Sequence, residues 1–150
     1  MIRLQREDFD PGQELAALTA GNHKVGGLAV FVGLVRDMAG DATVGAMTLE
    51  HYPGMTEKAL TGIAEQACER WRVLDLAVIH RVGPLKPAEQ IVLVMVASRH
   101  RGDAFAACEF IMDYLKTEAP FWKKETGAAG SSWVEARDSD LEARQKWKRR

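Results

Sequence analysis

The sequence predicts an α+β fold. Its apolar runs indicate two strands, a helix, two more strands and a second long helix, joined by short connections. With 150 residues the chain is long enough to bury one hydrophobic core. Its composition, 47 percent apolar and 27 percent charged, is ordinary for a globular protein. We therefore expect one domain over residues 1–150, with a basic C-terminal tail at about 139–150.

The N-terminal third predicts a short helix followed by two strands. Asp10 suits an N-cap and Pro11 the first helical position, while Gly21 suits the end of that helix. Residues 26–34 (GGLAVFVGL) are apolar at almost every position, which predicts a buried strand. After a polar, glycine-containing loop, residues 44–52 predict a second strand.

The first of two main helices follows the break at Pro53-Gly54. Its expected core face carries Leu60, Ile63, Ala64, Ala67, Cys68 and Trp71. Residues 74–80 then predict a strand, and residues 82–87 a rigid connection that contains two prolines. The most apolar run, residues 91–97 (IVLVMVA), predicts a central strand.

The second main helix ends near Lys116. Its expected buried face carries Phe105, Cys108, Ile111, Met112 and Leu115, at three- and four-residue spacing. Beyond it we expect a turn at Pro120, a loop over residues 127–132, a short strand over 133–136 and a terminal helix over 139–148. The strongly basic last residues, 144–150, are expected to be a solvated tail.

Charge and cysteine content narrow the possible functions. The net charge of −1 provides no global field for nucleic acid or anionic membranes, so any anion site must be local. Cys68 and Cys108 both fall on predicted apolar helix faces, which favours buried thiols. We find no cluster with metal-ligand spacing and no nucleotide-binding motif, and expect no metal and no cofactor. With no signal-peptide core and no membrane-length apolar run, we expect a cytoplasmic protein.

The most informative stretch is residues 113–125, where the second main helix meets the proline turn. Pro120 cannot continue a helix, so the chain must turn there. That turn can bring Lys123 back towards Lys116, with Phe121 and Trp122 as apolar walls. Two ammonium groups in such a place repel each other and lose water, which lowers a lysine pKa. The alternative is that these lysines only complement the dipole at the helix end.

Other cationic side chains follow the predicted strands. His100-Arg101 lies where strand gives way to helix, and free backbone N–H groups at a helix start bind phosphate well. Arg36 follows the strand over residues 26–34, and Arg137 follows the short strand over 133–136. If strands 26–34 and 91–97 end on the same side, these groups could join the lysines in one basic pocket. The alternative is ordinary surface solvation.

Several segments together resemble the large, catalytic subunit of molybdopterin synthase. The matching segments are 49–58 (LEHYPGMTEK), 79–83 (IHRVG), His100-Arg101, 111–117 (IMDYLKT), 119–125 (APFWKKE) and 133–137 (WVEAR). They occur in the family's order and cover residues from about 26 to 138. The resemblance implies an α/β-hammerhead type of fold, with antiparallel and mixed sheets.

The resemblance also implies an activity and partners. The enzyme is a sulfurtransferase: it moves sulfur from the C-terminal Gly-Gly thiocarboxylate of a small ubiquitin-like subunit to cyclic pyranopterin monophosphate. The product is the dithiolene of molybdopterin, in molybdenum cofactor biosynthesis. The family assembles as a homodimer of large subunits within a heterotetramer, with the site near the interface between the large subunits.

The resemblance assigns the site residues by position. Lys116 and Lys123 match the family's essential lysines and are the expected catalytic residues. The substrate-binding residues implied are Leu34, Val35, Arg36, His100, Arg101, Lys116, Lys123, Lys124 and Glu125, and we add Arg137 as a further candidate.

Two other functions use the same basic surface. A non-catalytic scaffold could bind a ubiquitin-like tail or another anionic partner through it, and would give binding without product. A protein that binds nucleotide or RNA phosphate is disfavoured by the near-neutral charge and by the lack of a basic face studded with aromatics.

Overall fold

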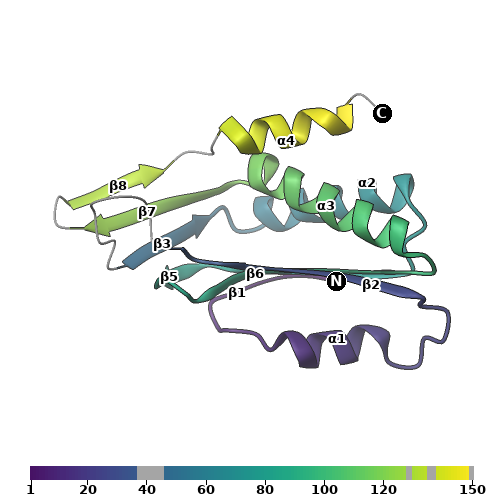
Figure 1. Cartoon of the computed structure of the whole chain (residues 1–150). Coiled ribbons are helices and arrows are strands. Elements are labelled where there is room, and N and C mark those ends of the chain that lie inside the picture. The colour runs from purple at the N-terminus through teal and green to yellow at the C-terminus, as the bar shows by residue number, and fades with distance from the viewer. Residues whose placement is uncertain (37–45, 128–129, 135–137, 149–150) are drawn as a thin grey trace.

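The computed structural model describes residues 1–36, 46–127, 130–134 and 138–148. Figure 1 shows a layered arrangement of two sheets and their covering helices. The strands are β1 (Ile2–Gln5), β2 (Gly27–Leu34), β3 (Ala46–His51), β4 (Asp75–Arg81), β5 (Gly83–Leu85), β6 (Gln90–Ser98), β7 (Phe121–Gly127) and β8 (Gly130–Val134). The helices are α1 (Pro11–Thr19), α2 (Met55–Arg70), α3 (Arg101–Glu118) and α4 (Asp138–Lys148).

The first sheet has the strand order β1-β4-β6-β2. Strand β1 is parallel to β4, whereas β4 and β2 are both antiparallel to β6. The second sheet has the order β5-β3-β7-β8, and its neighbouring strands are all antiparallel. Only Val82 separates β4 from β5, so the chain passes directly from one sheet into the other there. This combination confirms the predicted α+β class with mixed and antiparallel sheets.

The helices cover the first sheet on both faces. Figure 1 shows α2 and α3 together over one face, α1 under the other, and α4 lying on the outer side of α3. The main core lies between the first sheet and the two packed helices, which are the two that the sequence predicts. Its centre is β6, whose residues from Val92 to Ser98 are buried, as expected for a central strand.

The helix starts follow local chemistry. The carboxylate of Asp10 accepts hydrogen bonds from the backbone N–H groups of Gly12 and Gln13, at 2.9 and 3.2 Å, which confirms the predicted cap of α1. Gly54 precedes α2 with a φ of 84°, a conformation that favours glycine, and its N–H donates to Glu57. The Pro53-Gly54 break is therefore where the sequence places it.

Three predictions of burial are wrong. Phe105 is 65 percent exposed, because α3 turns a slightly different face, with Ala104, Ala107 and Phe110, to the core. Cys68 is exposed on α2. Strand β2 lies at the sheet edge, and its apolar side chains Val30, Phe31 and Leu34 are exposed.

The C-terminal segment is also more ordered than a solvated tail. The terminal helix is present as predicted, and Trp147 within it is 4 percent exposed. Its ring packs edge-on against Trp71 and Phe110, with centroids 5.4 and 5.6 Å away. Its indole N–H donates to Asp113 at 2.6 Å. These contacts attach α4 to α2 and α3.

Candidate functional site

The centre of the candidate site is the place where α3 ends and β7 begins. Ala119 adopts extended geometry, and the carbonyl of Pro120 accepts a hydrogen bond from the buried Thr56 hydroxyl at 3.1 Å. The same hydroxyl oxygen accepts from the backbone N–H of Tyr52. The predicted turn at Pro120 is confirmed; β7 begins directly after it, and the loop predicted over residues 127–132 is wrong in part, because β8 begins at Gly130. Thr56 thus fixes the turn to the start of α2.

Pairing with β3 determines which way the side chains of β7 point. Phe121 lies opposite His51, and Lys123 lies opposite Leu49. Because side chains alternate along a strand, Phe121 and Lys123 share one face of the second sheet. On that face Leu49 is 3 percent exposed, and Phe121 packs against the buried apolar cluster that contains Leu49. Lys123 is consequently half-buried beside an apolar surface.

A buried histidine lies where the two sheets meet. His80, near the end of β4, is 5 percent exposed, and its ring stacks on Phe121 with centroids 4.1 Å apart and planes at 21°. Its Nδ1 lies 2.8 Å from the carbonyl oxygen of Arg81. A carbonyl only accepts hydrogen bonds, so Nδ1 carries the proton and the neutral ring keeps Nε2 as an acceptor.

The environment of His80 favours the neutral ring. Burial is the main cause that lowers its pKa, to about 4, while the hydrogen bond to the Arg81 carbonyl acts in the opposite direction. The charges of Lys116, Lys123 and His51 lower the pKa further. His80 is therefore close enough to both lysines to feel their charge, which brings the last turn of α3 and the start of β7 to one site. Lys116 is exposed there.

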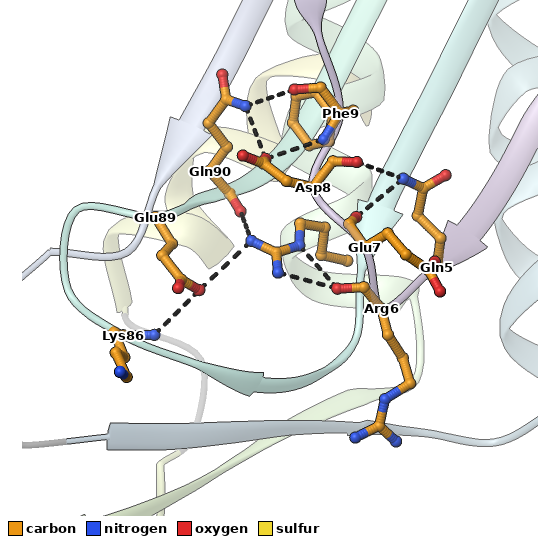
Figure 2. A network of polar contacts seen from close by, with 9 residues as sticks. Gln5, Arg6, Glu7, Asp8, Phe9, Lys86, Glu89 and Gln90 are labelled. Atoms are coloured by element: carbon orange, nitrogen blue, oxygen red, sulfur yellow. Dashed lines mark hydrogen bonds and ion pairs between the residues drawn. The ribbon is translucent and has the colours of Figure 1, made fainter.

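A polar network holds the end of β4 beside this site. The Arg81 guanidinium, almost fully buried, donates to the carbonyl of Arg6 and to the carbonyl of Gln90, at 2.9 and 3.1 Å, and pairs with Glu89 at 3.4 Å. Figure 2 shows the Gln90 side chain reaching back to Asp8. These bonds tie the N-terminal segment to the β5–β6 turn and fix the backbone on which His80 stands.

Arg36 lies at the same end of the first sheet as His80. Strand β2 ends at Leu34, opposite Gln90, and Val35 exchanges backbone hydrogen bonds with Glu89 and Ala88. The side chain of Val35 is buried, while Leu34 is 57 percent exposed and Arg36 is exposed. Leu34, Val35 and Arg36 are all expected to bind substrate, but the side chain of Val35 packs in the core.

His100 and Arg101 lie at the opposite end. Strands β2 and β6 are antiparallel, so they do not end on the same side, and the condition for one pocket within a single chain is not met. Gly27, at the start of β2, packs so closely on Arg101 that an added Cβ would lie 3.2 Å from its Cα. From Arg101 to Lys116 the helix rises about 22 Å, at roughly 1.5 Å per residue.

The start of α3 nevertheless suits an anion. His100 occupies the N-cap position with extended backbone and provides no side-chain cap, and both His100 and Arg101 are exposed. The first backbone N–H groups of a helix carry partial positive charge and point outward from its end. The predicted strand-to-helix junction is confirmed, but it is a second cationic place rather than part of the first.

Of the remaining expected residues, Lys124 and Glu125 belong to the second sheet. Lys124 pairs with Thr48 on one side and Trp133 on the other, and Glu125 pairs with Met47 and Ser132. Arg137 lies outside the described residues.

Sequence reasoning undervalued His80. No site role is assigned to His80 from the sequence, yet its ring stacks on Phe121 and feels the charges of both lysines. The available signal was its position between a buried strand and a glycine, within the segment IHRVG. What could not be inferred is that β4 ends against β7, because that contact joins residues far apart in the chain.

Within the described part of the chain, no three His, Cys, Asp or Glu side chains are placed to hold a metal ion. No helix there has the length and apolar character needed to cross a membrane.

The fold and these side chains define a class: an α+β protein with two cationic places, each suited to an anionic ligand. The chain belongs to the MoaE protein family, whose sequence profile matches residues 4–118.

Known proteins resemble this chain along nearly all of it. A molybdopterin synthase catalytic subunit of Ralstonia nicotianae is 60 percent identical over 97 percent of this chain and 83 percent of its own length. The structure of a molybdopterin biosynthesis MoaE protein from Burkholderia ambifaria is 59 percent identical, with a TM-score of 0.86, and covers 99 percent of this chain and 97 percent of that one. A crystal structure of molybdopterin synthase from Staphylococcus aureus is 32 percent identical, with a TM-score of 0.80, covering 87 and 94 percent of the two chains.

Proposed function

We propose that this chain is the catalytic subunit of molybdopterin synthase and acts in molybdenum cofactor biosynthesis. The observation that carries the proposal is the likeness to the Ralstonia subunit, 60 percent identical over 97 percent of this chain. Because that relative is named a subunit, a partner chain is part of the proposal. The partner is a small ubiquitin-like protein whose C-terminal thiocarboxylate supplies sulfur to cyclic pyranopterin monophosphate.

The lysines suit this chemistry. A cyclic phosphate and a thiocarboxylate tail are both anionic, and charge that develops on oxygen during acyl transfer is stabilised by positive groups held nearby. In the proposed reaction the thiocarboxylate sulfur attacks a side-chain carbon of the pterin, and a C–O bond of that carbon breaks as its oxygen leaves. Water then hydrolyses the thioester, which leaves the sulfur on the pterin and a carboxylate on the small subunit. Lys116 stabilises charge or moves protons, and Lys123 holds the substrate. A second sulfur-loaded small subunit completes the dithiolene.

In the proposed enzyme, the cationic place at the start of α3 contributes to the site of a second copy of the chain. His100 and Arg101 are too far from Lys116 to act on the same small substrate within one chain. Among the described strands β2 lies at an edge of the first sheet, and its side chains Phe31 and Leu34 are 42 and 57 percent exposed. An apolar sheet edge of this kind is a natural surface for a twofold dimer. We propose that dimerisation brings His100 and Arg101 of one copy to the lysines of the other.

The direct test is conversion of the precursor by purified protein. We expect wild-type protein with thiocarboxylated small subunit to give dithiolene product, and Lys116→Ala to lose nearly all turnover while it binds the small subunit normally. Lys148→Ala, which removes an exposed lysine from α4, is the matched control and should behave as wild type. Binding of the small subunit without any product from wild-type protein would favour the scaffold and refute the enzyme.

A further inference from the structure

His80 contacts a residue of the candidate site although it belongs to the first sheet. It stacks on Phe121 near the end of β4, two residues before the chain passes into β5, and the charges of Lys116 and Lys123 act on its ring. Among the described residues, the titratable groups whose charges act on its ring are Lys116 on α3, Lys123 on β7 and His51 on β3. The two ammonium groups oppose a positive charge on the ring, which favours its neutral form.

The contact with Phe121 reaches the lysine that the proposed function uses to hold substrate. Phe121 is the first residue of β7, and Lys123 lies two residues later on the same face. The backbone N–H of Phe121 donates to the carbonyl of Ala119 at 2.8 Å, and Thr56 holds Pro120 from the side of α2. The turn is therefore fixed by hydrogen bonds at its backbone and by the His80 ring at its first side chain.

We propose that His80 is a positioning residue for the reaction: its ring clamps Phe121 and thereby sets where Lys123 lies relative to Lys116. This inference rests on the proposed function, because it concerns how that substrate is held. A displacement of about 1 Å in a positioning group is enough to cost on the order of a hundredfold in rate. The clamp gives Lys123 a defined place although its side chain is long and rotatable.

The chemistry of imidazole explains why a histidine fits here. A phenyl ring would stack equally well but would leave the Arg81 carbonyl oxygen without the donor at 2.8 Å. A lysine or arginine would add a buried charge beside two ammonium groups. Neutral imidazole supplies the flat ring and the donor together.

Two substitutions, made in the complete two-subunit enzyme, separate the role of the flat ring from that of the hydrogen-bond donor. His80→Phe keeps a flat ring and loses the donor, whereas His80→Asn keeps a donor near the Nδ1 position and loses the ring. We expect His80→Asn to raise the Kd of cyclic pyranopterin monophosphate about tenfold, equivalent to about 1.4 kcal/mol. We expect His80→Phe to keep the precursor Kd and the affinity for the small subunit near wild type. An unchanged precursor Kd in His80→Asn, or equal losses in the two variants, would overturn the proposal.

A double variant tests whether His80 acts through Lys123. If it does, His80→Asn adds no further loss of precursor affinity to that of Lys123→Ala, since the clamp then positions nothing. Independent, additive losses would contradict the clamp. A merely structural role would lower the amount of folded enzyme and leave the precursor Kd of the folded fraction unchanged.

Substitutions of Phe121 address the same clamp should His80→Asn fail to fold. Phe121→Leu removes the ring from the other side of the stack and should weaken precursor binding as His80→Asn does, while Phe121→Tyr should bind as wild type. Wild-type binding by Phe121→Leu would overturn the inference. If wild-type enzyme neither binds nor converts the precursor, the proposed function itself fails, a result that differs from an active enzyme indifferent to His80.

Discussion

The imidazole of His80 makes the stability of this protein depend on pH. Its pKa falls from 6.5 to about 4 on folding, mainly through burial, so the unfolded chain binds the proton more tightly. Its contribution to stability is complete above pH 6.5, declines as the pH falls towards 4, and is constant below that. Integrated over this window the loss is on the order of 3 kcal/mol.

This prediction is checked by denaturant unfolding of wild type and His80→Phe at pH 7 and pH 4.5. Wild type should lose more stability between the two values than the variant, because the variant has no imidazole to protonate. Asp8, whose pKa is lowered mainly by its hydrogen bond with Gln90, is present in both proteins and cancels in the comparison. The same pH dependence in both proteins would show that His80 is not buried as described.

The two cysteines should differ in reactivity. Burial raises the pKa of the Cys108 thiol to about 11, and its Sγ faces the carbonyl of Val94 within the core. Cys68 is exposed, although partial burial raises its pKa as well. Since the thiolate is the reactive form, iodoacetamide should modify Cys68 first and Cys108 only on unfolding. Peptide mass spectrometry reports the order, and Cys68→Ser is the control that should remain unmodified while folded.

Trp147 is the main apolar contact by which α4 packs on α2 and α3. Trp147 is buried against Trp71 and Phe110, and the Arg70 side chain donates to its backbone carbonyl at 3.1 Å. We expect Trp147→Ala to lower the free energy of unfolding by about 3–5 kcal/mol. Leu141→Ala, in the same helix at a side chain 44 percent exposed, should change it by less than about 0.5 kcal/mol. Equal effects in urea denaturation would mean that α4 does not dock through Trp147.

Sequence reasoning succeeded where an element is determined locally and failed where it is determined by a distant neighbour. The cap at Asp10, the break at Gly54 and the apolar run of β6 are local signals, and each is confirmed. The sequence predicts a turn at Pro120 and no strand over residues 121–127, where the structure has β7. It is a strand because β3 pairs with it along Ala46–His51, which no short window reveals.

The same limit explains the errors in burial. Strand β2 has the composition of a buried strand, but its place at the sheet edge depends on the order of all the strands. In α3 the apolar spacing is satisfied by more than one face, and the small side chains Ala104 and Ala107 decide which face packs closely on β6. Phe105, counted in the predicted face, is exposed as a result.

For the whole molecule, the site residues named from the sequence stay predictions, and what the sequence could not indicate is which of them meet. The lysines, Arg36 and the pair His100-Arg101 were all named from their motifs. Which of them meet depends on strand direction: antiparallel β2 and β6 put Arg36 and His100-Arg101 at opposite ends of the first sheet. A site that uses both ends requires two copies, which is a property of the assembly and not of any segment.

Complementation between two inactive variants is the most direct test of a site shared between two copies of the chain. Lys116→Ala and Arg101→Ala chains, carrying different tags, would be co-expressed and assayed with thiocarboxylated small subunit and precursor. In a twofold dimer with shared sites, each mixed dimer contains one site that has both Lys116 and Arg101. We predict that random pairing restores roughly a quarter of wild-type turnover, since half of the dimers are mixed and each has one intact site. Mixed dimers that form but show no turnover above that of the separate variants would contradict the shared site.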